Sequence, residues 1–274
     1  MKKTLKGLYL GLILIFLYSP IAVMIVLSFN ASKSRAKWGG FTLDWYVRLT
    51  QRSDILQALW VTLSVAVIAT VLATILGTAA AIGIQAMRRR PAALLMKASY
   101  LPMTTPDIVT GVSLMLMFVF VNIPMGYWTM VMAHVAFDTP YVLFSVMPKL
   151  RQTDHNLYEA ALDLGCTPLQ AVRKVILPEI MPGVVSGALL SFTMSLDDFV
   201  ISYFTAGNGF QTLPIRIYNM TKKTVTPKMY ALATIIFFVI LALLLLSNLS
   251  DSDGSQSIKA ARQKRKNAKA QNHV

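Results

Sequence analysis

Four stretches of this chain contain no Asp, Glu, Lys or Arg, and each is long enough to cross a lipid bilayer. They cover residues 7–32, 55–87, 108–137 and 229–250. A helix needs roughly 20 apolar residues to span the ~30 Å hydrocarbon layer. Because 55% of the chain is hydrophobic and only 14% is charged, a soluble domain is a poor description. The sequence therefore predicts an all-α, multi-pass membrane protein.

The spacing of the apolar segments predicts six transmembrane helices, at residues 8–29, 58–86, 96–121, 127–147, 181–205 and 229–249. We expect a tight turn at 122–126, a long charged loop at 148–180, and a segment outside the bilayer at 206–228. Residues 41–57 have mixed polarity and predict a short interfacial helix with its aromatic rings at the headgroups. These segments would form one membrane domain over residues 1–250, followed by a basic, disordered tail at 251–274.

The distribution of basic residues predicts the orientation. If the N-terminus is inside, the inside segments hold 17 Lys and Arg and the outside segments hold 9. Because basic residues favour the cytoplasmic side, both termini and the 148–180 loop should be cytoplasmic. The net charge of +14 is then explained by anionic lipid headgroups rather than by nucleic acid. The first apolar run is too long for a cleaved signal peptide, so we expect it to remain as a helix.

The charged loop begins with a short predicted helix. Asp154 can serve as its N-cap, and Gly165 is a natural stop because glycine reaches the left-handed conformation at little steric cost. Four apolar residues recur at helical spacing and predict a stripe along one face, namely Leu157, Ala160, Ala161 and Leu164.

A second helix is predicted directly after this corner. Thr167 would cap it, Pro168 would take the first position, and Gln170 would complete a capping box. We expect Pro178 and Pro182 to break the chain before the next span. The loop therefore reads as helix, glycine corner, helix.

This loop resembles the EAA motif of permease subunits in ATP-binding-cassette (ABC) importers: EAA, three residues, G, nine residues, I, one residue, LP. The single difference is Val175 at the Ile position. In that family the motif forms coupling helices that dock into a groove on the ATPase subunit. The resemblance implies that contact for the matching residues, which are Glu159, Ala160, Ala161, Gly165, Leu177 and Pro178.

The resemblance extends over roughly residues 8–250. Segments 27–32, 106–109, 191–200 and 230–234 are similar to spermidine/putrescine permease subunits. This implies the type I importer permease (MetI-like) fold in a bacterial cytoplasmic membrane. It also implies three partners, which are an ABC ATPase dimer, a second related permease forming a heterodimer, and an extracytoplasmic polyamine-binding protein.

Four acidic residues, Asp107, Asp138, Asp197 and Asp198, fall within the predicted spans, and no Lys or Arg lies deep in any of them. A charged Asp at mid-bilayer costs roughly 2.5–3.5 kcal/mol, so a cationic solute would fit this deficit. Tyr203 and Phe204 are candidate aromatic contacts for such a cation.

Each acid also has a structural interpretation. Asp107 could bind amides at a helix start, and Asp138 precedes Thr139-Pro140, where capping at a kink is favoured over solute contact. Asp197 and Asp198 lie about 100° apart on a helix, so only one should face the pathway, with Asp198 weakly favoured. The lone His134 is more typical of a hydrogen-bonded packing residue than of a proton relay.

The absence of catalytic motifs bounds the activity. The sequence contains no G-x-x-x-x-G-K-[ST] phosphate loop, so ATP would be bound by the partner ATPase and this chain needs no cofactor. A single cysteine, Cys166, excludes an intramolecular disulfide and a multi-cysteine metal site. Three hypotheses remain. The first is the permease subunit of a polyamine ABC importer. The second is a proton-coupled secondary carrier for organic cations, for which inverted repeats would be expected, although the sequence has no convincing internal repeat. The third is a membrane assembly or receptor protein, which would leave the intramembrane carboxylates unexplained.

Overall fold

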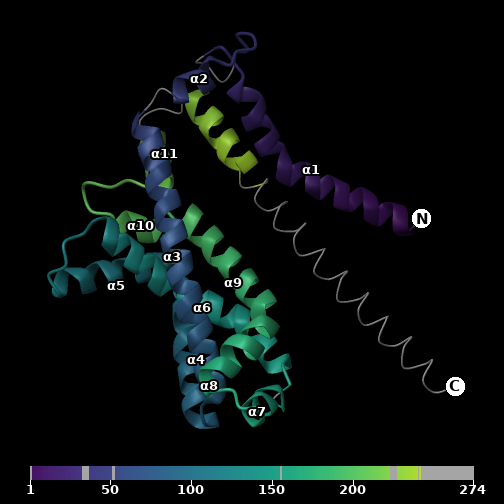
Figure 1. The fold of residues 1–274 in the computed structure, drawn as a ribbon. Coiled ribbons are helices and arrows are strands. Elements are labelled where there is room, and N and C mark those ends of the chain that lie inside the picture. The colour runs from purple at the N-terminus through teal and green to yellow at the C-terminus, as the bar shows by residue number, and fades with distance from the viewer. Residues whose placement is uncertain are drawn as a thin grey trace. The chain divides into compact units, whose positions relative to one another are not determined.

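The computed structural model describes residues 2–32, 37–50, 53–154, 156–222, 227–239 and 241 (Figure 1). The chain divides into two units. The larger comprises Ser53–Lys222, and the smaller joins the described parts of Met1–Arg52 and Lys223–Val274. The basic tail at 251–274 lies outside the described residues, and the single 1–250 domain stays a prediction.

Three long helices make the centre of the larger unit: α3 (Ser53–Ala86), α6 (Tyr127–Gln152) and α9 (Leu177–Asp197). They lie side by side (Figure 1). Small residues permit this close approach. On α3 they form a fully buried stripe of Ala66, Ala69, Ala73 and Ala81, with Gly77 in line.

Small residues also permit the close contact between α6 and α9. Gly183 and Gly187 of α9 face α6, and a Cβ added at Gly187 would lie 3.1 Å from the Val142 Cα atom. Ser145 on α6 donates a hydrogen bond to the Gly183 carbonyl at 3.2 Å. The helix backbones therefore meet almost directly.

Two of the predicted spans are broken. The predicted 96–121 helix is α4 (Arg89–Thr104) and α5 (Asp107–Phe120), which meet at 107°. Pro106 forces its neighbour Thr105 into an extended conformation and ends α4. The predicted 181–205 helix ends at Asp197, and α10 (Val200–Thr205) follows. Both continuous helices were wrong predictions.

Among the described residues, four helices are long and apolar enough to span a membrane, or five if the bent α4–α5 pair counts as one span. The four are Gly7–Ser28, Ser53–Ala86, Tyr127–Gln152 and Pro168–Asp197. A shorter apolar helix, Pro227–Val239, begins the predicted sixth span. The rest of that span lies largely outside the described residues, so the count of six stays a prediction.

Three short helices complete the larger unit: α7 (Asn156–Asp163), α8 (Pro168–Ala171) and α11 (Leu213–Thr221). The tight turn predicted at 122–126 is confirmed between α5 and α6. α11 lies in the 206–228 segment, for which the sequence predicted a position outside the bilayer but no helix. Its nine residues, with a proline near the start, are too few to give a clear helical periodicity.

The smaller unit contains α1 (Lys2–Ser28), α2 (Asp44–Thr50) and the Pro227–Val239 helix. The predicted helix within 41–57 is confirmed as α2. Its aromatic rings are not free for headgroups, since Trp45 is buried and its indole N–H donates to the Asn30 carbonyl at 2.8 Å. Tyr46 shares a 2.6 Å hydrogen bond with Ser28.

Candidate coupling elbow and polar pathway

The predicted glycine corner is present, and we call residues 154–171 the elbow. Asp154 accepts a hydrogen bond from the backbone N–H of Asn156 at 3.0 Å, at the start of α7. At its end, Gly165 has φ +84. The N–H groups of Gly165 and Cys166 donate to the carbonyls of Leu162 and Ala161. This pair of bonds is the Schellman arrangement, which requires a left-handed residue at this position.

The second half of the elbow is also capped as predicted. Thr167 accepts from the Gln170 N–H at 3.4 Å, and the Gln170 side chain accepts from the Thr167 N–H at 3.0 Å. Pro168 takes the first helical position. Reciprocal bonds of this kind fix where a helix begins.

The two prolines after the elbow do not break the helix, so that prediction was wrong. A π-helical turn, Val172–Ile176, connects α8 to α9, and the Leu177 N–H donates to the Val172 carbonyl five residues earlier. The wider turn gives room for Pro178, which has no N–H to donate. Pro182 lies inside α9. The elbow is therefore joined to α9 without a loop.

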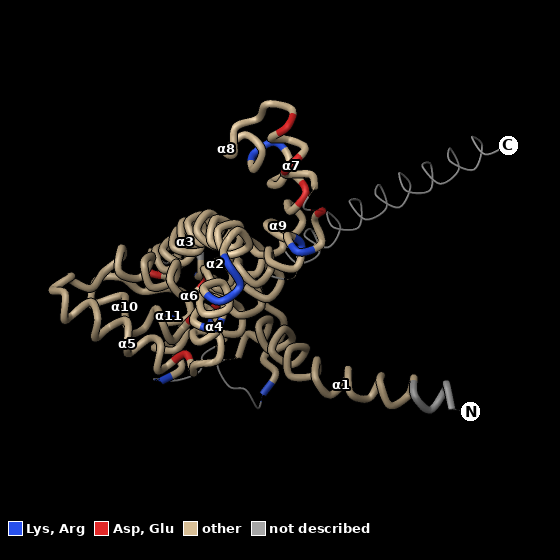
Figure 2. The backbone as a smooth tube through the Cα atoms, turned by 90° about the horizontal axis from the view of Figure 1, so that it is seen from below, with Lys and Arg blue, Asp and Glu red and all other residues tan. Residues whose placement is uncertain are grey.

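The elbow exposes three leucines, which together we call its apolar face. Leu164 is 87% exposed, Leu169 is 78% exposed and Leu157 is 42% exposed. Glu159 and Ala160 are exposed beside them, whereas Ala161 is buried. No other described part of the larger unit covers these leucines. Figure 2 shows acidic segments on the elbow, and the basic residues Arg173 and Lys174 follow it in the π-turn.

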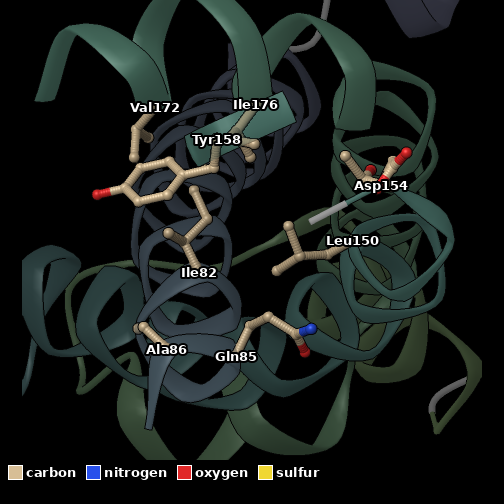
Figure 3. A pocket seen from close by; sticks show the side chains of 10 residues that line it. Ile82, Gln85, Ala86, Leu150, Asp154, Tyr158, Val172 and Ile176 are labelled. Carbon is tan, nitrogen blue, oxygen red and sulfur yellow. The ribbon is translucent and has the colours of Figure 1, made fainter. Parts of the chain in front are cut away.

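Tyr158 anchors the other face of α7. Its ring lies beside Ile82, Val172 and Ile176 in Figure 3, at one side of a pocket of about 370 Å³ between the end of α3, the end of α6 and the π-turn. Tyr158 also packs on the core cluster of these helices. The sequence did not predict this role of Tyr158. The signal was available, because Tyr158 and Ala161 are three residues apart and therefore lie on the same face of the helix.

A buried polar cluster lies where α6, α9 and α10 meet. His134 is 1% exposed. Its Nδ1 lies 2.6 Å from Ser195 Oγ, and its Nε2 lies 3.0 Å from Ser202 Oγ and 3.4 Å from Asp198 Oδ2. The prediction that His134 is a hydrogen-bonded packing residue is confirmed.

The carboxylate of Asp198 accepts hydrogen bonds from the chain itself. Its Oδ1 accepts from the Ile201 N–H at 3.2 Å and its Oδ2 from the Ser202 N–H at 2.7 Å. Asp198 therefore caps α10 directly after the break in the fifth span. Asp138, also buried, lies inside the continuous α6 and does not cap a kink, so that expectation was wrong.

The other predicted pathway residues are accessible. Asp197 at the end of α9 and Asp107 at the start of α5 are exposed. Tyr203 and Phe204 line one hollow of about 440 Å³ with Asn208, Gln211 and Asn219. The structure thus brings the two aromatic residues together with three amides, but neither aspartate lines that hollow. Their contact with a solute stays a prediction.

At the end of the larger unit where α3 begins, three contacts that the sequence did not predict connect α3 and α11 and bring Gly207 against Met125. Thr62 accepts from the Leu213 N–H at 2.7 Å, and Asp54 forms an ion pair with Arg216 of α11. Gly207 has φ +65, and a Cβ there would lie 2.6 Å from the Met125 carbonyl. These partners are about 80 to 160 residues apart in sequence, so no local pattern signals them.

The fold is that of an ABC importer permease chain. It matches a chain of a bacterial ABC transporter involved in the import of the acidic polysaccharide alginate, with a TM-score of 0.66 and 17% identity, covering 89% of this chain and 93% of that chain. The chain belongs to the family of binding-protein-dependent transport system inner membrane components, whose model matches residues 73–252.

Relatives within this family carry transport names. The chain is 40% identical over 245 residues to the spermidine/putrescine transport system permease protein PotC of Haemophilus influenzae, covering 89% of this chain and 95% of the relative. It is 38% identical to the putrescine transport system permease protein PotI of Escherichia coli, covering 81% of each. With its apolar helices, the chain is a multi-pass protein of the bacterial inner membrane.

Proposed function

We propose that this chain is the permease subunit of an ABC importer that moves spermidine- or putrescine-type polyamines inward. A separate ATPase dimer would bind and hydrolyse ATP, and this chain would be non-catalytic. A second related permease would complete the pathway, and an extracytoplasmic polyamine-binding protein would deliver the solute. The names of the relatives support the solute class.

The single observation that carries the coupling role is the apolar face of the elbow. Leu157, Leu164 and Leu169 are exposed on a segment whose own contacts are complete. The π-turn makes the elbow continuous with α9, so a push on the elbow would move α9 as one body. We place this elbow and both termini at the cytoplasmic face, where the ATPase would dock.

The proposed solute contacts follow from charge and aromatic character. Asp107 and Asp197 are the exposed carboxylates of the larger unit that lie next to breaks in the spans. Tyr203 and Phe204, with rings 5.6 Å apart and edge to face, offer π faces to an ammonium group. The amides that share their hollow can accept hydrogen bonds from the same group.

The coupling role is tested by Glu159→Lys in vesicles that contain the whole transporter. We expect normal amounts of the complex in the membrane but loss of ATP-driven uptake of radiolabelled spermidine. Glu179→Lys is the matched control, because Glu179 is also exposed but lies beyond the elbow. Undiminished uptake by Glu159→Lys would contradict the role of the elbow.

The solute assignment needs its own experiment. Uptake by the intact complex is competed with putrescine, spermidine, monoamines and inorganic cations, and we expect only the polyamines to compete at low concentration. Asp107→Asn and Asp197→Asn should each weaken spermidine uptake while leaving assembly unchanged. Unchanged uptake in both variants would remove these residues from the pathway.

A further inference from the structure

The buried polar cluster holds two carboxyl groups and a single imidazole. Asp138 is fully buried, the Asp198 side chain is 8% exposed, and His134 is 1% exposed. The helices that surround them offer no other positive charge at this depth. Residues 55–87, 108–137 and 175–215 contain no Lys or Arg. Even when His134 carries a proton, it neutralises one carboxylate and leaves the second without a counter-charge.

The remaining ionisable groups on these elements do not supply one. α3 carries Asp54 near its start, α5 carries Asp107, α6 carries Tyr141 near the cluster, and Glu179 and Asp197 lie at the two ends of α9. The only cations on these elements, Lys149 and Arg151, lie in the last turn of α6, at least eleven residues from Asp138. An ionised carboxylate that is buried without a partner is costly, so one of the two carboxyl groups must be neutral.

Hydrogen bonding decides which carboxyl group keeps the negative charge. Asp198 receives two backbone N–H donors, at 3.2 and 2.7 Å, and lies 3.4 Å from the imidazole Nε2. Backbone N–H groups cannot accept a proton, so they favour the ionised form of a carboxyl group. Asp198 is therefore the carboxylate.

Asp138 has the opposite surroundings. Its Oδ2 lies 3.1 Å from Ser191 Oγ on α9, and its Oδ1, buried, has no hydrogen-bond partner. Ser191 Oγ in turn lies 3.5 Å from Thr70 Oγ1 on α3. A hydroxyl group can accept a proton as well as donate one, so this chain of oxygens suits a protonated acid at its end.

We propose that Asp138 is a neutral carboxylic acid at physiological pH, whose O–H donates to Ser191 Oγ while Ser191 donates to Thr70 Oγ1. The three residues come from α6, α9 and α3, so these two hydrogen bonds link all three helices of the core. Asp138 is then a positioning residue. It neither binds the transported cation nor carries protons across the membrane.

Infrared spectroscopy of the purified complex in lipid tests the protonation state. The difference between the native protein and Asp138→Asn should contain the C=O band of a protonated carboxylic acid, unchanged from mildly acidic to mildly alkaline pH. Ser191→Ala should shift that band, because the acid loses its acceptor. A spectrum without the band, or a band that titrates near neutral pH, would overturn the proposal.

Transport gives a second, independent measurement. Asp138→Asn keeps a neutral side chain with a donor, so uptake should stay within about twofold of the native rate, with an unchanged pH profile. Asp198→Asn is the contrasting variant and should lose most uptake, because two N–H groups and His134 lose their anion. If Asp138→Asn assembles normally but does not transport, the charge of Asp138 is needed and the proposal fails. If it does not assemble, the Ser191→Ala spectrum decides.

Discussion

The elbow and the polar cluster place their side chains in opposite ways. The elbow turns leucines away from the unit, with Leu164 87% exposed. The cluster buries His134, Asp138 and three serines in the middle of apolar helices. A soluble domain would hide the first set and expose the second.

The two regions differ in whether their side chains find partners within this chain. In the cluster, nearly every polar atom finds a partner on a neighbouring helix, as buried polar groups require. In the elbow, the backbone is satisfied by caps while the apolar face is left uncovered. The cluster therefore stabilises this chain, whereas the elbow leaves its leucines uncovered for the association that we propose.

If the helix core stabilises the chain and the elbow does not, a change in the core should have the largest effect on unfolding. In Gly77→Val, the new Cβ would lie 2.7 Å from Val142 Cβ and 2.9 Å from the Thr139 carbonyl. Because the latter is backbone, we expect a loss of about 3 kcal/mol or more of stability and little folded protein. Thermal unfolding in detergent measures this.

Gly83→Val is the matched control on the same helix, since a Cβ there meets nothing within 4 Å. It should unfold at nearly the native temperature. Equal unfolding temperatures for Gly77→Val and the native chain would mean that α3 and α6 do not pack as described.

The exposed leucines test the elbow directly. Leu164→Asp and Leu169→Asp should each weaken ATPase binding at least about tenfold, because a carboxylate would be buried in an apolar contact. The unfolding temperature of the isolated chain should not change, since both side chains are exposed. Binding is measured by co-purification with the ATPase.

Leu164→Met is the control and should bind normally. If the aspartate variants bind the ATPase as well as the native chain does, the apolar face of the elbow is not its docking surface.

The shape of the elbow depends on a smaller conformational effect. Gly165→Ala adds a methyl group with nothing within 4 Å, but at φ +84. The left-handed conformation costs about 1 kcal/mol for alanine, and spermidine uptake should fall modestly because the corner opens more readily. Gly165→Asn tolerates this conformation better and should lie between alanine and the native protein. Equal uptake by all three would show that the corner is not shape-critical.

Local signals in the sequence were sufficient for the elbow. The spacing of Asp154, Gly165, Thr167 and Gln170 predicted two capped helices, and each capping contact is present. The predicted interruption at Pro178 failed because a π-turn, which no residue pattern announces, connects α8 to α9 without a break.

The cluster could be predicted only in part. The sequence marked His134 and the aspartates as unusual, but it could not pair them, since Ser195 and Ser202 lie more than 60 residues from His134 along the chain. The burial of Asp198 likewise depends on the break after α9. Which residues of two distant helices meet depends on how far one helix is shifted along the other. Small residues such as Gly187 help to set this shift, but only once the helices have packed.

The smallest effect concerns the cap of the second elbow helix. Thr167→Ala removes the hydroxyl that accepts from the Gln170 N–H at 3.4 Å. The reciprocal bond, from the Thr167 N–H to the Gln170 side chain at 3.0 Å, survives because it uses the backbone. We therefore expect a loss of only about 0.5 kcal/mol, at the low end for an N-cap. Hydrogen exchange of the α8 amides measures it, and Thr167→Ser should restore native protection. If alanine changes global unfolding but not this local exchange, the capping contact does not set where the elbow helix begins.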